Sequence, residues 1–199
     1  VEAVFKSFDI PFWPQLPKRS FREDMYCQFS QGLPGVVIDD AKRTVRVDNS
    51  GDLSEDLAKV YEAHISGDYK GFEIGEGFAS GFYAFMEAAR GYEPECVKGH
   101  VTGPVSFGLG VTDKAGKSII YDENLREAMV KLLEIKALWQ IEKLKEISSQ
   151  VMIFIDEPYL VSFGSSFVNI QRDEIVSMLN LVIKSVHSKG AIAGVHCCG

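Results

Sequence analysis

The chain has 199 residues, 46% of them hydrophobic, and a net charge of −7 at pH 7. That length is sufficient for one buried core. Because phosphate binding needs a basic surface, the acidic balance excludes nucleic acid and anionic membranes as main partners. No apolar run reaches the roughly 18 residues of a membrane span, and no signal-peptide pattern is present. Four cysteines without the spacing of a disulfide scaffold indicate reduced thiols and a cytoplasmic protein.

Residues 1–96 are predicted to form an N-terminal elaboration with a hairpin and helices. Prolines at positions 11, 14, 17 and 34 disfavour long regular elements at the start, so only a short helix over 20–31 is expected there. The stretch VVIDDAKRTVRVD (36–48) predicts two short strands around a turn. Further helices are predicted over 54–66, with Ser54 as N-cap, and over 77–91, where Gly91 ends the helix.

Residues 97–199 show a regular alternation of elements, and we expect them to form a single domain with the first 96. The predicted order is strand 97–104, polar loop 108–122, helix 122–148, strand 151–155, helix 171–190 and strand 191–195. This order is typical of parallel βα units. Because a complete eight-unit barrel takes about 250 residues, we expect a partial (β/α)8 TIM barrel. An open doubly wound sheet is the alternative, which the absence of a glycine-rich phosphate turn weakens.

Polar residues follow each predicted strand, at the end where parallel α/β folds gather their reactive groups. The last strand ends in His196, Cys197 and Cys198. Because side chains alternate along a strand, His196 and Cys198 share a face while Cys197 points away. An imidazole and a thiolate are ligands that suit Zn²⁺. A buried histidine beside two buried thiols is the alternative interpretation.

The two earlier strand ends carry candidate catalytic and substrate-binding residues. Asp156 and Glu157 follow the second strand, where a carboxylate can act as a general base or hold a substrate ammonium. A solvated carboxylate or the cap of the next turn is the alternative. After the first strand, Thr102 and Gly103 offer backbone N–H groups to a ligand, and His100 shares a face with Thr102. A simple turn and a core histidine are the alternatives there.

Three motifs together carry a resemblance to a known family. VTGPVS, FIDEP and His-X-Cys occur in this order over Val101–Cys198, about half of the chain. They resemble the catalytic barrel of cobalamin-independent methionine synthase, whose superfamily also contains uroporphyrinogen decarboxylase and the corrinoid-linked methyltransferases. The N-terminal stretch IPFWPQLPKRSFREDM resembles the methionine-synthase-like proteins of this superfamily more than the synthase itself.

The resemblance implies a zinc-dependent methyltransferase of the methionine biosynthesis type. His196 and Cys198 would be two zinc ligands, and the remaining ligands would come from strands that follow Gly199. Asp156 would bind the amino group of a homocysteine-like thiol substrate. Zinc would hold the substrate sulfur as a thiolate, the reactive form. The thiolate would attack a methyl group carried by a methylfolate or a methylcorrinoid.

Two other functions stay open on the sequence alone. A uroporphyrinogen-decarboxylase-like enzyme without metal would need arginines to hold carboxylates, for which Arg19 and Arg22 are the candidates. A non-catalytic ligand-binding barrel is the other alternative. The missing initial Met and the incomplete barrel lead us to expect a longer protein. Because the last strand of a partial barrel has an unpaired edge, we also expect a homo-oligomer.

Overall fold

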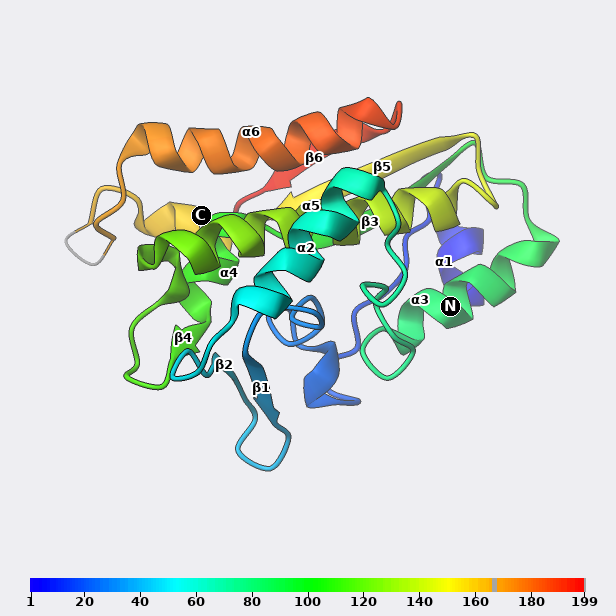
Figure 1. The fold of residues 1–199 in the computed structure, drawn as a ribbon. Coiled ribbons are helices and arrows are strands. Elements are labelled where there is room, and N and C mark those ends of the chain that lie inside the picture. Colours follow the sequence, from blue (N-terminus) through cyan, green and yellow to red (C-terminus); the bar gives the residue numbers. More distant parts are fainter. Residues whose placement is uncertain (166–167, 199) are drawn as a thin grey trace.

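The structure is a computed structural model that describes residues 1–165 and 168–198. Within these residues the fold is mixed α/β, with six α-helices and two separate three-stranded sheets (Figure 1). One sheet carries the three strand ends on which the sequence analysis places its candidate residues. The other sheet contains the predicted N-terminal hairpin.

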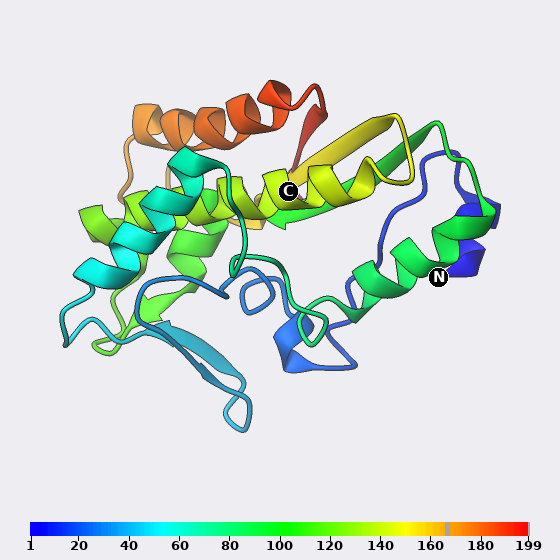
Figure 2. The same cartoon turned by 45° about the vertical axis from the view of Figure 1, so that its right-hand side comes forward.

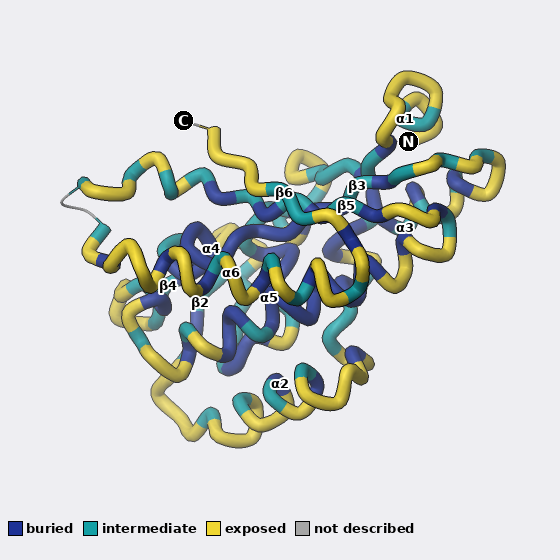
Figure 3. The backbone as a smooth tube through the Cα atoms, turned by 90° about the horizontal axis from the view of Figure 1, so that it is seen from above, coloured by how far each residue is buried: buried dark blue, intermediate teal, exposed yellow. Residues whose placement is uncertain are grey.

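The sheet that positions the candidate residues is parallel, with strand order β3-β5-β6. Its strands are β3 (Cys96–Thr102), β5 (Gln150–Asp156) and β6 (Ile192–His196). The helices α5 (Glu123–Leu144) and α6 (Arg172–Ser188) precede β5 and β6 and pack side by side (Figure 3). Gly99 faces α5, because a Cβ at this position would contact Leu144 of α5. By alternation, His100 and Asp156 belong to the opposite face.

A buried glutamine of α5 connects the sheet to the N-terminal segment. Gln140 accepts a hydrogen bond from the indole Nε1 of Trp13 at 3.0 Å and donates one to the carbonyl of His100 at 2.9 Å. All three residues are buried. Since an unpaired buried amide is costly, this bridge fixes Trp13 beside β3.

The helix α2 (Ser54–Ser66) packs on the outside of α5 (Figure 3), and two ionisable side chains of α5 are buried. The carboxylate of Glu134 in α5 contacts the imidazole Nε2 of His64 in α2. Lys136 of α5 is fully buried and its Nζ donates to the carbonyl of Phe72 at 2.7 Å. Because both buried groups have partners, α5 can be enclosed on nearly all sides.

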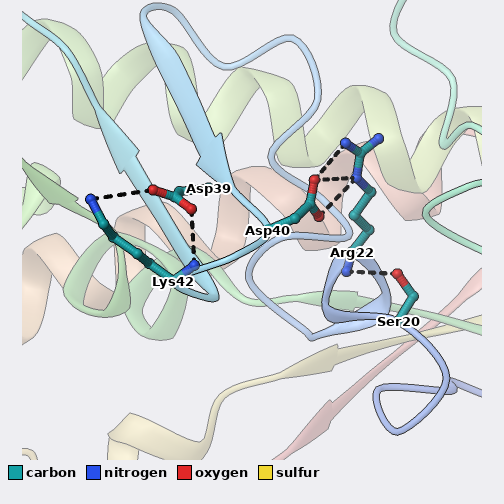
Figure 4. A network of polar contacts seen from close by, with 5 residues as sticks. All are labelled: Ser20, Arg22, Asp39, Asp40 and Lys42. Carbon is teal, nitrogen blue, oxygen red and sulfur yellow. Dashed lines mark hydrogen bonds and ion pairs between the residues drawn. The ribbon is translucent and has the colours of Figure 1, made fainter.

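The second sheet has the order β1-β2-β4. Its strands are β1 (Val36–Asp39), β2 (Thr44–Val47) and β4 (Thr112–Asp113). The pair β1–β2 is antiparallel, which confirms the predicted hairpin, and β4 adds in parallel to β2. The guanidinium of Arg22 donates to both carboxylate oxygens of Asp40 in the hairpin turn, at 3.0 and 2.7 Å (Figure 4). This bidentate pair ties the hairpin to the 3-10 turn at Phe21–Glu23.

The N-terminal helix lies against α3 at the far end of the molecule (Figure 2). The helices are α1 (Glu2–Ser7) and α3 (Ser80–Ala88). The ring of Phe5 stacks on those of Phe85 and Tyr92, with centroid distances of 4.6 and 4.8 Å. From there the chain runs along the outer edge of β3, where Phe12 forms an isolated parallel bridge with Lys98.

The expected TIM barrel is wrong. Within residues 1–165 and 168–198 the parallel sheet has three strands and does not close. The hairpin strands do not join it, because β2 pairs with β4 in a sheet of its own. The alternation of strands and helices does correspond to parallel pairing, but that pattern specifies neighbouring units and not the number of strands in the sheet.

Two local predictions are also wrong, and one is refined. The stretch 20–31 forms only the 3-10 turn and further turns instead of a helix. The predicted loop 108–122 begins inside helix α4 (Pro104–Gly110), which includes residues 108–110. The first residue of this helix is a proline, which is favoured at that position. The helix over 54–66 is confirmed, but its N-cap is Leu53, one residue before the predicted Ser54.

Candidate functional site

Residues from all three strands of the parallel sheet line one cavity of about 380 Å³. In the register of the sheet Thr102 is paired with Asp156 and Asp156 with His196, so they form one row across the carboxyl ends. The cavity is lined by Phe12, Trp13, Pro14, Gln15, Met25, Lys98, His100, Asp156, Pro158, His196 and Cys198. The structure therefore brings together four predicted site residues, namely His100, Asp156, His196 and Cys198.

His196 and Cys198 approach each other at the end of β6, with 2.7 Å between Nε2 and Sγ. Both residues are exposed, as is Cys197, so the alternative of two buried thiols is wrong. Of the two neighbouring thiols, only Cys198 lines the cavity in the described part of the chain. An imidazole and a thiol therefore face the same space from positions i and i+2.

Asp156 lies in the cavity wall, on the strand next to His196. Partial burial raises the pKa of Asp156, and the charges of His196 and Lys98 act in the opposite direction. Ile155, the preceding residue, is fully buried, as expected if it faces the helices and Asp156 faces the cavity. A carboxylate in this position is suited to accept hydrogen bonds from a ligand ammonium group.

Lys98 is a cavity residue that the sequence analysis missed. It lies two residues before His100, and strand alternation could have identified it. Its Nζ lies 4.3 Å from the ring centroid of Phe154. Among the residues that the structure describes, no carboxylate forms an ion pair with it within 4.0 Å. Trp13 and Met25 reach the cavity from irregular segments, for which the sequence offers no comparable signal.

His100 lies in the cavity wall beneath the N-terminal segment and is 7% exposed. Its ring stacks on that of Trp13 with 3.9 Å between centroids. Burial, with a smaller effect of the Lys98 charge, lowers the pKa of His100 to about 3. Its Nε2 is buried without a hydrogen-bond partner in residues 1–165 and 168–198.

Glu157, predicted as catalytic, is fully buried and lies at the N-terminus of α4. Its carboxylate accepts hydrogen bonds from the backbone N–H groups of Val105 and Ser106, at 2.9 and 2.7 Å, and from Ser106 Oγ at 2.6 Å. Burial raises the pKa of Glu157, and these hydrogen bonds lower it. The side chain thus caps α4 in the way that a helix N-terminus favours. The alternative, a cap of the turn that follows Glu157, is wrong, because among the described residues its side chain makes no capping hydrogen bond to the 3-10 turn at Pro158–Ser162.

Thr102 and Gly103, predicted to bind substrate, are occupied by contacts within the protein. The hydroxyl of Thr102 donates to the carbonyl of Met25 at 2.5 Å. A Cβ at position 103 would overlap the carboxylate of Glu157, so glycine is needed there for steric reasons. Neither residue is among the described residues that line the cavity.

The donor types of His196 and Cys198 fit zinc, but two donors do not complete a site. Across the described ranges 1–165 and 168–198, no group of three or more His, Cys, Asp and Glu residues could hold a metal ion. Catalytic zinc sites use three protein ligands and structural sites four. A zinc ion held here would also have to replace the direct contact between Nε2 and Sγ.

Comparisons of the chain with protein-family models, curated proteins and solved structures found no match. The likeness to the methionine synthase superfamily therefore stays a prediction from short motifs. In the described part of the chain, no helix combines the length and the apolar character that crossing a membrane requires.

The contact between Gly103 and Glu157 predicts a non-additive pair of substitutions. Gly103→Ala should destabilise the protein by about 1–3 kcal/mol through overpacking, and Glu157→Ala by about 2–4 kcal/mol through unpaired donors at α4. In the Glu157→Ala background, Gly103→Ala should cost much less, because the overlapping carboxylate is gone. Urea unfolding of the four proteins measures the cycle.

Glu157→Gln is the matched control for this cycle, because it keeps the bulk at position 157. Gly103→Ala should cost as much in the Gln background as in the wild type. Equal costs of Gly103→Ala in all three backgrounds would contradict the assigned contact.

The buried imidazole predicts a pH-dependent loss of stability. His100 stays neutral in the folded state down to about pH 3, whereas in the unfolded chain it takes up a proton near pH 6.5. The free energy of unfolding is therefore unaffected by His100 above pH 6.5, and it decreases as the pH falls from 6.5 to 3. Between pH 7 and 5 the loss is about 2 kcal/mol.

His100→Phe keeps a ring against Trp13 and removes the titrating group. Urea unfolding at pH 7 and pH 5 should show a smaller loss for this variant than for the wild type, by about 2 kcal/mol. An identical pH dependence for the two proteins would show that His100 is not buried as a neutral ring.

Proposed function

We propose that the cavity is the substrate site of a zinc-dependent methyltransferase that acts on a small thiol of the homocysteine type. The observation that carries the proposal is that Asp156, His196 and Cys198 converge on one cavity at the ends of adjacent strands. The proposal depends on this site, since the expected barrel is not present in the described residues.

His196 and Cys198 are the residues that would hold the metal. Their nitrogen and sulfur donors suit a borderline-soft ion, and both are at the exposed end of a strand, where they can adjust. Two protein donors leave coordination positions to be filled, and the sulfur of the substrate would be one further ligand. When bound, zinc lowers the pKa of a coordinated thiol and so supplies a thiolate at neutral pH.

The remaining cavity residues would orient the substrate. Asp156 would accept hydrogen bonds from the substrate ammonium, which places the substrate chain along the row of strand ends. Phe12 and Met25 supply apolar walls that cover the methylene groups. The substrate sulfur would then form a bond to the methyl carbon of a methylfolate or a methylcorrinoid, and the bond between that carbon and the donor would break.

No observation favours the decarboxylase alternative. Arg19 forms an ion pair with Glu23, and Arg22 forms one with Asp40, at 2.8 and 2.7 Å. Neither arginine is among the described residues that line the cavity. A carboxylate-rich tetrapyrrole would therefore lack the arginine contacts that such a substrate requires.

Zinc binding in the presence of thiol substrate tests the proposal. The purified chain should bind Zn²⁺ more tightly when homocysteine is added, measured by titration calorimetry and metal analysis. His196→Ala and Cys198→Ser should each weaken this binding by at least about tenfold, because each removes one of two protein donors. Cys197→Ser is the matched control and should bind like the wild type. Equal zinc content in all four proteins would contradict the proposal.

We also propose that the chain self-associates at the free edge of β6. In the described residues β6 pairs with β5 alone, and Ile192 and Val195 are each 45% exposed. An apolar unpaired edge favours pairing with another chain. Light scattering should show a species larger than a monomer, and Ile192→Lys should shift it toward monomer. A monomer at high micromolar concentration would contradict this proposal.

A further inference from the structure

We propose that a second cavity, beside the hairpin sheet, is a binding site for a small sugar phosphate. This cavity has a volume of about 560 Å³ and lies between β2, β4 and the 3-10 turn at Phe21–Glu23. The sheet that borders it lies apart from the parallel sheet (Figure 1). Its described lining shares no residue with that of the first cavity. The proposal therefore does not rest on the zinc-dependent activity, and either one can fail without the other.

The first argument is an unpartnered buried donor in the wall of the second cavity. Arg46 lies on β2 and is paired in register with Thr112 of β4, and both residues line the cavity. The Nε of Arg46 is buried and has no hydrogen-bond partner in residues 1–165 and 168–198. Because a buried donor of a charged group is costly without an acceptor, a bound anion would supply the partner that the protein itself does not.

A second arginine is held at the same cavity by an unfavourable backbone conformation. Arg43, the residue before β2, has a φ of +53°, the one positive value of a non-glycine residue in the described chain. A glycine would avoid the steric cost that an arginine has in this conformation. The guanidinium of Arg43 lies 5.3 Å from the ring centroid of Phe21, another lining residue. A costly conformation that keeps a cation at a cavity is evidence that this cation binds a ligand.

Carboxylates of the protein do not neutralise the two arginines. Among the residues that the structure describes, neither arginine forms an ion pair within 4.0 Å. The carboxylates in the lining contact their own turns instead. Asp24 accepts from the backbone N–H of Tyr26 at 3.1 Å, and Asp113 accepts from two backbone N–H groups of the next turn, at 2.8 and 2.9 Å. Lys114, the third lining cation, is paired with Asp48 at 2.6 Å.

The polar groups of the lining indicate the chemistry of the ligand. Two guanidiniums match the oxygens of a phosphate, and three positions along the chain separate their backbones by at most about 10 Å, which two extended arginine side chains span. The hydroxyl of Thr112 is a further donor at the same cavity. Asp24 and Asp113 can only accept hydrogen bonds, so they match hydroxyl groups of a ligand. A phosphate and hydroxyl groups in one small molecule describe a sugar phosphate.

The aromatic residues of the lining favour a free sugar phosphate over a nucleotide. Phe21 and Tyr26 are the aromatic residues of the described lining, and both already have partners. The guanidinium of Arg43 lies over Phe21, and Tyr26 is stacked on Tyr159 with 6.5 Å between centroids. A nucleotide base would have to compete with these contacts in order to stack, and a sugar would not.

Titration calorimetry of the purified chain with ribose 5-phosphate tests the proposal. The Kd should be below about 1 mM, and binding should be at least as tight as that of AMP and tighter than that of inorganic phosphate or succinate. Arg46→Gln and Arg43→Asn should each weaken binding by at least about tenfold, because each removes one guanidinium. Asparagine tolerates the backbone of position 43, so the urea midpoint of Arg43→Asn should not fall below that of the wild type.

Lys42→Gln is the matched control, because it removes the same charge from the same hairpin turn. Lys42 pairs with Asp39 and is not among the described residues that line the cavity (Figure 4). This variant should bind ribose 5-phosphate within about twofold of the wild type. No binding to the wild type, or equal weakening by Lys42→Gln and the two arginine variants, would overturn the site.

Asp24→Asn tests the hydroxyl contacts separately, because it keeps the oxygen that accepts from Tyr26 N and removes the charge. It should lower the preference for ribose 5-phosphate over inorganic phosphate, since an amide oxygen is a weaker acceptor than a carboxylate. An unchanged preference would overturn the assignment of a sugar. Tighter binding of succinate to the wild type would overturn the phosphate, and tighter binding of AMP would overturn the free sugar phosphate.

Discussion

The packing of Glu157 against Gly103 is the constraint on which the geometry of the site depends. The carboxylate caps α4, and the missing side chain of Gly103 leaves room for it. Two backbone hydrogen bonds also join the ends of neighbouring strands. Gly103 N donates to the carbonyl of Asp156 and Glu157 N donates to the carbonyl of His196, each at 2.8 Å. The ends of β3, β5 and β6 are thereby held at one level, and Asp156 is held at the cavity while its neighbour Glu157 is held in the core.

Much of this arrangement could be predicted from the sequence, because it depends on local periodicity. Alternation along β6 places His196 and Cys198 on one side, and the parallel order of β3, β5 and β6 brings their polar ends together. The hairpin and the helix over 54–66 follow from equally local patterns. In each of these features, residues close together in the sequence determine the secondary structure and the side-chain direction.

The parts that could not be predicted depend on contacts between distant segments. Whether a carboxylate caps a helix or faces a cavity depends on what lies beside it. Alternation directs Asp156 and Glu157 to different sides, but it does not show that Glu157 meets the start of α4. The same holds for β2, which pairs with β4 some 65 residues later rather than with the parallel sheet. In the described residues the pattern typical of barrel units supplies three parallel strands, and the hairpin adds none to them. Lys98 is different, since the alternation rule that identified His100 applies to it as well.

The position of Trp13 gives the protein an optical property. The chain has two tryptophans, Trp13 and Trp139. Trp13 is one of the residues that line the cavity, and its buried indole lies flat on His100, another lining residue, whereas Trp139 is packed against Phe82 in the core. A molecule that enters the cavity therefore changes the surroundings of one of two fluorophores, and the intrinsic emission of the unlabelled protein reports whether the cavity is occupied.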